Sequence, residues 1–190
     1  MRKTGWRTVA LMMALLVALT GCGKDKPKAK KVEDELQRGL NAHVAGDTNG
    51  AIQHYEEVLK IDPTNKFAIY NIGLIKQNAG DKGEAERRYR AVLTIDPNYG
   101  PALFNLGIIR FEAGSNDEAI QLYQRTIAVE PRNANAYLNL GFAYKAGGKQ
   151  READQAFATA VRLDPSLRAR IPARTASPSP TPHTTVSPTP

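Results

Sequence analysis

Few side chains in this 190-residue chain could do chemistry: it has one cysteine, Cys22, and three histidines. His43 and His54 are eleven positions apart and His183 lies near the end of the chain. Metal sites combine His or Cys ligands at short spacing, often with carboxylates, and no such grouping occurs. A glycine-rich phosphate loop and a Gly-x-Ser-x-Gly nucleophile motif are also absent from the sequence. We therefore expect no metal, no cofactor and no enzymatic activity.

The context of Cys22 predicts a secretory signal. Arg2, Lys3 and Arg7 precede an uninterrupted apolar run at residues 9–19, which ends three residues before Cys22. A helix that spans a bilayer needs about 20 apolar residues, so this run is too short for a permanent crossing. A basic start, a short apolar stretch and small residues before the cut are typical of a cleaved signal peptide.

Leu19-Thr20-Gly21-Cys22 resembles the bacterial lipoprotein box. The resemblance implies that residues 1–21 are removed and that the Cys22 thiol carries a diacylglyceryl group, which with further acylation anchors a protein stably in a membrane. Gly23, rather than Asp, after the cysteine implies the outer membrane of a diderm cell, or the outer face of the plasma membrane in a monoderm one. The alternative is an uncleaved anchor, or an ordinary signal with an incidental cysteine.

A period of 34 residues runs through the rest of the chain. Five sets of residues, called columns here, recur at this spacing. Two columns are glycine, one is alanine, one is proline preceded by an acidic residue, and one is aromatic. The columns are Gly39, Gly73, Gly107 and Gly141; Gly46, Gly80, Gly114 and Gly148; Ala51, Ala85, Ala119 and Ala153; Pro63, Pro97, Pro131 and Pro165; and Tyr55, Tyr89, Tyr123 and Phe157.

Each unit is predicted to form two amphipathic helices. In the second unit they cover about 70–78 and 82–95, with a break at Gly80 and an end at Pro97. A glycine inside a helix costs about 1 kcal/mol relative to alanine, so Gly73 needs a packing reason. We expect it to lie against the small side chain of Ala85, with Tyr89 filling the space one turn further on.

The pattern "YNIGLIKQNAGDKGEAERRYRAVLTIDP" resembles the tetratricopeptide repeat, or TPR. The resemblance implies an all-α solenoid of four helix-turn-helix repeats, at about 32–65, 66–99, 100–133 and 134–168, in a right-handed superhelix with disordered termini. The first repeat departs from the others at Arg38, as an end repeat does. Only Tyr144 matches the tyrosine usual three residues after the first glycine.

TPR arrays line a concave groove with their first helices, and the resemblance implies that a second apolar face of these helices forms its floor. Asn71, Asn105 and Asn139 would form a ladder of amides that suits the backbone of an extended peptide. The alternative is that these residues pack between repeats and the amides bond to the scaffold. The predicted groove residues are Phe67, Tyr70, Asn71, Leu74, Phe104, Asn105, Ile108, Leu138, Asn139 and Phe142.

Some TPR proteins hold a terminal carboxylate with a clamp of basic residues on these helices. The corresponding surface here contains apolar residues such as Leu36 and Leu40. We therefore expect the ligand to be a neutral or partly apolar peptide or helix of a partner protein.

After Pro165 the chain is too short for the closing helix of many arrays. The last repeat is therefore predicted to expose part of its stacking face, which could pair with a second copy in a homodimer. The alternative is that polar residues such as Gln155 and Arg162 already cover that end.

Residues 22–31 are predicted to be the lipidated cysteine and a basic spacer, and residues 169–190 a disordered tail rich in Pro, Ser and Thr. The net charge of +7 belongs to the signal, the spacer and the tail, whereas residues 32–168 have 16 basic and 18 acidic side chains. This distribution disfavours a polyanion-binding domain, and we expect no nucleic-acid partner.

The expected function is that of a lipid-anchored TPR scaffold in the bacterial cell envelope. It would bind a peptide or helix of another protein in its groove, and the lipid on Cys22 would attach it to the membrane. The alternative is a structural spacer or an assembly factor for pili, secretion or cell-wall machinery, without a selective groove.

Overall fold

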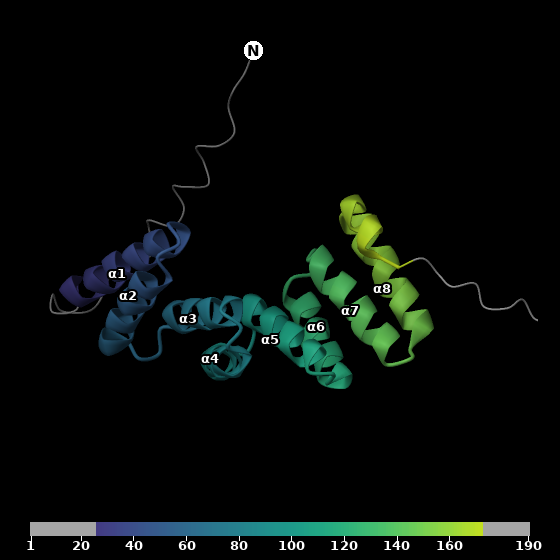
Figure 1. Ribbon diagram of the computed structural model, residues 1–190, viewed down its shortest axis with the longest axis horizontal. Coiled ribbons are helices and arrows are strands. Elements are labelled where there is room, and N and C mark those ends of the chain that lie inside the picture. Colours follow the sequence, from purple (N-terminus) through teal and green to yellow (C-terminus); the bar gives the residue numbers. More distant parts are fainter. Residues whose placement is uncertain (1–25, 173–190) are drawn as a thin grey trace, which may run out of the picture. The chain divides into compact units, whose positions relative to one another are not determined.

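A computed structural model describes residues 26–172, which are helical throughout apart from short turns (Figure 1). The predicted all-α fold of four helix pairs is confirmed. Residues up to Ala68 and residues from Ile69 form two compact units, each described here by itself. The helices are α1 Lys26–Val44, α2 Thr48–Ile61, α3 Lys66–Asn78, α4 Lys82–Ile95, α5 Gly100–Glu112, α6 Asn116–Val129, α7 Ala134–Ala146 and α8 Gln150–Leu163, followed by the 3₁₀ helix η1, Pro165–Arg170.

The turn within each pair follows from the second glycine column. Gly80 has φ +84°, a left-handed conformation that an L side chain disfavours. The next residue, Asp81, caps α4 by accepting the Glu84 N–H at 3.1 Å. The predicted break and the predicted bounds of α4 are therefore both correct.

The first helix of the second pair begins earlier than predicted, at Lys66 rather than near Tyr70. Asn65 explains the early start, because its side-chain oxygen accepts the Ala68 N–H at 3.1 Å and caps the helix. In the fourth pair, Asn133 makes the equivalent bond to Ala136 at 2.9 Å.

The first glycine column packs against the aromatic column. A Cβ built on Gly107 would lie 2.6 Å from the ring of Tyr123, and one on Gly73 would lie 3.0 Å from the ring of Tyr89. The atoms nearest to that Cβ on Gly73 belong to Arg88 and Tyr89 rather than to the expected Ala85, so the ring approaches the helix backbone more closely than the alanine does. The aromatic rings therefore set how closely the two helices of a pair approach.

Successive pairs in the second unit pack through one apolar position of each first helix. Leu140 on α7 lies in a cluster with Ala119, Ile120 and Tyr123 of α6. Leu106 on α5 is likewise buried. The equivalent Arg38 in the first pair is exposed and pairs with Glu35 at 3.0 Å. A charge is tolerated there because no pair precedes it among the described residues.

Helix α1 is longer than the other first helices, with 19 residues against 13 in each of α3, α5 and α7. It begins at Lys26, inside the segment predicted to be a spacer. Residues 26–31 are thus part of a regular helix, and the predicted boundary at Val32 does not mark its start. The predicted signal peptide, Cys22 and most of the tail lie outside the described residues.

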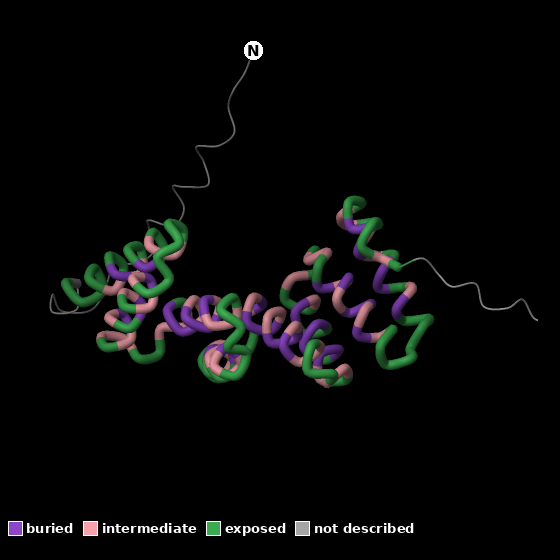
Figure 2. The backbone as a smooth tube through the Cα atoms, viewed as in Figure 1, coloured by how far each residue is buried: buried purple, intermediate pink, exposed green. Residues whose placement is uncertain are grey.

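The last pair is partly covered. The six-residue helix η1 packs on α8, and Leu167 lies buried in a cluster with Leu138, Phe157 and Ala160. This short helix therefore shields part of the stacking face that is predicted to be exposed. Figure 2 shows the buried positions running through the helices of each pair.

Candidate protein-binding surface

Three tyrosines meet where the second and third helix pairs join. Tyr70 on α3 lies 5.7 Å from Tyr89 on α4 and 5.3 Å from Tyr99, measured between ring centroids. The Tyr70 and Tyr99 rings are at 72°, an edge-to-face arrangement that aromatic pairs favour. Tyr89 is fully buried, whereas Tyr70 and Tyr99 remain partly accessible. A partner could therefore contact the outer two rings.

Hydrogen bonds fix this tyrosine cluster, which we define as Tyr70, Tyr89 and Tyr99. The Asn105 amide on α5 donates to the Tyr70 hydroxyl at 3.0 Å. The Tyr89 hydroxyl donates to Gln77 Oε1 at 2.7 Å. Asn105 thus bonds to the scaffold, as the alternative interpretation of the ladder supposed, yet its amide oxygen can still accept a further bond.

Burial raises the pKa of the Tyr70, Tyr89 and Tyr99 hydroxyls. The negative charge of Glu130 adds to the effect at Tyr70 and Tyr99. These phenols consequently stay neutral at physiological pH, where each can both donate and accept a hydrogen bond. Such groups suit a peptide backbone better than they suit a charged side chain.

The structure places nine of the ten predicted groove residues at accessible positions. Phe67, in the first unit, has 48% of its surface exposed. The residues that are half-buried on the first helices of the second unit are Tyr70, Asn71, Leu74, Phe104, Asn105, Ile108, Asn139 and Phe142. Leu138 was wrongly predicted to line the groove: it is fully buried beside Phe157 and Leu167.

Contacts among these residues mostly link one helix to its neighbour. Phe104 lies 6.0 Å from the Tyr123 ring, and Phe142 lies 5.1 Å from the Phe157 ring. A hydrogen bond joins two of the predicted residues, Tyr70 and Asn105, across neighbouring pairs. The predicted surface is therefore partly consumed by packing, and its side chains remain half-buried rather than fully exposed.

Tyr99 is a surface residue that the prediction missed. The 34-residue period places it in the column of Asn65 and Asn133, both of which cap the following helix. Tyr99 makes no side-chain cap on α5 and contributes its ring to Tyr70 instead. This departure from the repeat was visible in the sequence as an aromatic residue in a column of capping asparagines.

A network of charges joins the same two pairs away from the tyrosine cluster. Arg110 on α5 lies 3.2 Å from Glu86 on α4 and 2.7 Å from Glu118 on α6. Arg90 bonds to both carboxylates as well, at 3.0 and 2.8 Å. Arg110 occupies the repeat position that Tyr144 occupies in the next pair. The contact between the second and third pairs is therefore made by charged side chains, where the next contact uses an aromatic side chain.

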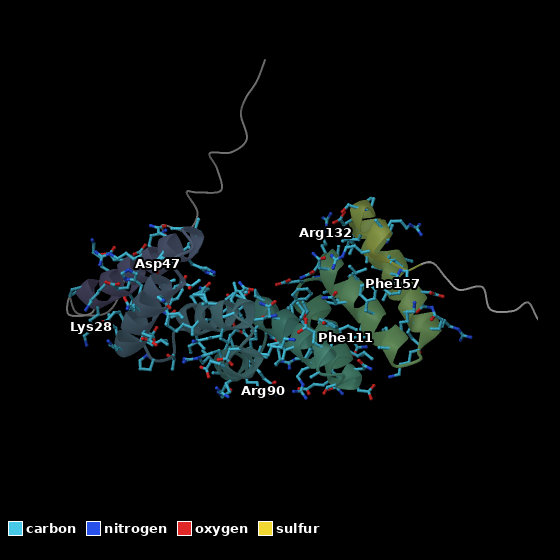
Figure 3. The ribbon with its side chains drawn as sticks, viewed as in Figure 1. Lys28, Asp47, Arg90, Phe111, Arg132 and Phe157 are labelled. Atoms are coloured by element: carbon cyan, nitrogen blue, oxygen red, sulfur yellow. The ribbon has the colours of Figure 1, made fainter. Side chains whose placement is uncertain are left out.

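A cleft of about 350 Å³ lies beside this network, and most of its lining comes from the second helices α4 and α6. Leu93, Leu106 and Leu122 supply its apolar lining, and Arg90 and Arg125 its charges. The label on Arg90 marks its position on α4 (Figure 3). Arg125 donates to the Pro97 carbonyl at 2.6 Å, so this guanidinium is already engaged by the scaffold.

Neither a metal site nor a membrane crossing is found between residues 26 and 172. No cluster of three or more His, Cys, Asp or Glu side chains is close enough to hold a metal ion in this part of the chain. None of its helices combines the length and the apolar character that a transmembrane segment requires.

The geometry defines a TPR-like scaffold, whose helix pairs present side chains for contact with other proteins. Residues 39–164 match the family described as the middle TPR-like domain of cilia and flagella-associated protein 70, and the chain belongs to this family. TPR domains are usually non-catalytic scaffolds for protein–protein interaction, and the fold supports the same role here.

Solved structures show the same fold. A crystal structure of MamA is 26% identical, with a TM-score of 0.65, over 77% of this chain and 85% of that one. A MamA fragment from Desulfovibrio magneticus RS-1 is 24% identical, with a TM-score of 0.65, over 71% and 76%. A mutant O-GlcNAc transferase from Thermobaculum terrenum is 24% identical, with a TM-score of 0.57, over 62% of this chain and 22% of that one. No curated protein matches the chain significantly.

Proposed function

We propose that this protein is a lipid-anchored adaptor of the bacterial cell envelope that binds an uncharged peptide or helix of a partner protein along its first helices. The row of half-buried aromatic and amide side chains on α3, α5 and α7 carries the proposal. It combines apolar area, which supplies affinity, with amide and phenol groups. These groups can form hydrogen bonds with a peptide backbone without selecting particular side chains of the peptide.

The residue types on the first helices limit the class of ligand, because they do not form a basic clamp for a terminal carboxylate. On the first helices, the accessible positions around Tyr70, Phe104 and Ile108 are apolar or amide-bearing, and Arg110 is committed to Glu86 and Glu118. A terminal carboxylate at Arg110 would have to displace the carboxylates of Glu86 and Glu118. A neutral extended segment, or the apolar face of an amphipathic helix, fits this surface better.

A photo-crosslinking amino acid at Phe104, in native cells, tests the surface directly. We expect one dominant crosslinked protein, which the double variant Phe104→Ala/Asn105→Ala should no longer capture in a pull-down. Gln121→Ala/Arg125→Ala, on the second helix of the same pair, is the matched control and should leave capture unchanged. Unchanged capture by the first variant, with normal helical content in both, would overturn the proposed surface.

The anchor is tested separately. Cys22→Ala removes the thiol that would be acylated, so the protein should move from the membrane fraction to the soluble fraction. Cys22→Ser gives a second, nearly isosteric variant with the same expectation. Mass spectrometry of the wild-type protein should show an acylated N-terminal cysteine; an unmodified Cys22 in a chain that still begins at Met1 would exclude the anchor.

A further inference from the structure

The basic segment before the repeats is helical, and it extends α1 beyond the length that the fold uses. A shift of 34 residues aligns the start of α3, at Lys66, with Val32 on α1. The six residues 26–31 before that point have no counterpart in the later pairs. They add about 9 Å to the helix, at 1.5 Å per residue.

This extension is highly charged and solvent-facing. It contains Lys26, Lys28, Lys30 and Lys31, and every residue from Pro27 to Lys31 is exposed (Figure 2). Lys28 is labelled near the start of α1 in Figure 3. None of the residues from Pro27 to Lys31 is buried, so packing against α2 does not account for their composition.

The lysine charges are only weakly balanced within the fold. Lys30 lies 3.7 Å from Asp34, with 74% of its side chain exposed, and such a pair contributes little to stability. Lys31 acts electrostatically on Glu57, which has a closer partner in Lys60. Most of the positive charge of the extension is therefore available to an external anion.

The position of Cys22 identifies the anion. Lys26 is four positions after Cys22, and an extended chain of four residues spans at most about 14 Å. A lipid on Cys22 would hold the lysines within about one to two Debye lengths of the headgroups at physiological salt. A rigid helix keeps them there, whereas a flexible spacer would let them disperse.

From this juxtaposition we infer that Lys28, Lys30 and Lys31 form a lysine face that binds anionic lipid headgroups and holds the first helix pair at the membrane surface. The inference rests on the lipid anchor proposed above. Each lysine close to an anionic bilayer strengthens membrane binding roughly fivefold, so three together give on the order of a hundredfold.

Vesicle partitioning of the full chain with Cys22→Ala, which carries no lipid, measures the lysine face without the contribution of the anchor. The measured quantity is the ratio of its partition coefficients for vesicles with 30% phosphatidylglycerol in phosphatidylcholine and for pure phosphatidylcholine, at about 0.1 M salt. Arg2, Lys3, Arg7 and the apolar run at residues 9–19 are the same in every variant, so their contribution cancels when the ratios of two variants are compared. Lys28→Gln/Lys30→Gln/Lys31→Gln should lower the ratio at least tenfold.

The matched control is Lys82→Gln/Lys145→Gln/Lys149→Gln, which removes three exposed lysines from the second unit and should leave the ratio unchanged. An equal ratio in the wild type and the α1 variant, or an equal loss in the control, would overturn the lysine face. So would displacement from the vesicles by an equimolar single-stranded oligonucleotide, which would assign the lysines to nucleic acid. No acyl group takes part in this measurement, so a negative result here would not argue against the lipid anchor. Conversely, if the wild-type protein proves to be unacylated, the vesicle measurement still tests the lysine face.

Discussion

The ring of Tyr123 lies against the backbone of Gly107, so closely that a Cβ on the glycine would come within 2.6 Å of the ring. Tyr123 is fully buried, with neighbours on all sides, and cannot swing away. The same relationship recurs at Gly39 with Tyr55 and at Gly141 with Phe157. An invariant contact between the two helices of a pair thus uses the smallest residue on one side and a large ring on the other.

Gly107→Ala should destabilise the protein by about 2 kcal/mol, because the added methyl overpacks a core that cannot relax. Gly83→Ala is the control: Gly83 lies on exposed α4 surface with its nearest neighbours 3.9 Å from a built Cβ. That change should stabilise by about 0.5 kcal/mol through helix propensity. Urea unfolding followed by helical circular dichroism, fitted repeat by repeat, measures both; equal effects would contradict the packing account.

Arg110→Ala should destabilise the joint between the second and third helix pairs by about 1 kcal/mol, since Glu86 and Glu118 lose one of their two shared cations and keep only Arg90. The loss should shrink as salt is raised, because these side chains are partly solvent-accessible. Arg87→Ala removes an exposed pair with Glu84 and should have a smaller effect. A salt-independent loss at Arg110 would mean that packing of its stem, not its charge, stabilises the joint.

Arg110→Tyr introduces the residue type found at the equivalent Tyr144, whose hydroxyl accepts a hydrogen bond from Gln124 at 2.9 Å. Arg90, the equivalent of Gln124, can donate to a tyrosine hydroxyl in the same way. We expect this variant to be less sensitive to salt than the wild type in thermal unfolding. A salt dependence equal to that of the wild type would show that the network is not its source.

Stability should fall as the pH rises above about 10. Burial raises the pKa of Tyr70, Tyr89, Tyr99 and Tyr123 in the folded protein, whereas unfolded tyrosines ionise near their ordinary value. The unfolded state then releases protons that the folded state retains, so the stabilisation is complete below pH 10 and is lost above it. Phenolate absorbance should rise together with the loss of helical signal; ionisation of all seven tyrosines before any helix is lost would contradict the raised values.

Tyr99→Asn should weaken partner capture and leave stability within about 1 kcal/mol of the wild type. The asparagine can cap α5, as Asn133 caps α7, which gains about as much as the lost ring contact with Tyr70 contributed. Tyr99→Phe keeps the ring and should retain capture. Full capture by Tyr99→Asn would remove this residue from the binding surface.

The 34-residue period was enough to predict the helix pairs and their turns, because glycine, acid and proline act locally on the backbone. It could not predict which neighbour lies over Gly73, since that depends on how far the Tyr89 ring reaches across the helix interface. It also misplaced Leu138, because a helix with two apolar faces does not reveal which face η1 and α8 will cover.

The start of α1 was missed for a different reason. A run of lysines with one proline has the composition of a linker, and its helical state follows from continuation of the packed turns that begin near Val32. The binding surface was predicted as a set of columns, yet Tyr99 breaks its column. The position of greatest interest is thus the one where the repeat pattern fails.

The exposed charge at Arg38 has a consequence for assembly. In later pairs this position holds an apolar side chain that docks onto the preceding pair, as Leu140 docks onto α6. At the other end Asp154 stands on α8 where Ile120 is buried on α6. Because Leu140 packs with Ile120, a head-to-tail junction of two copies would bring Arg38 of one copy beside Asp154 of the other, and such a junction has no closed symmetry to limit it. An apolar contact of the repeat is thus replaced by two opposite charges, whose desolvation makes that junction costlier than the one between Leu140 and Ile120.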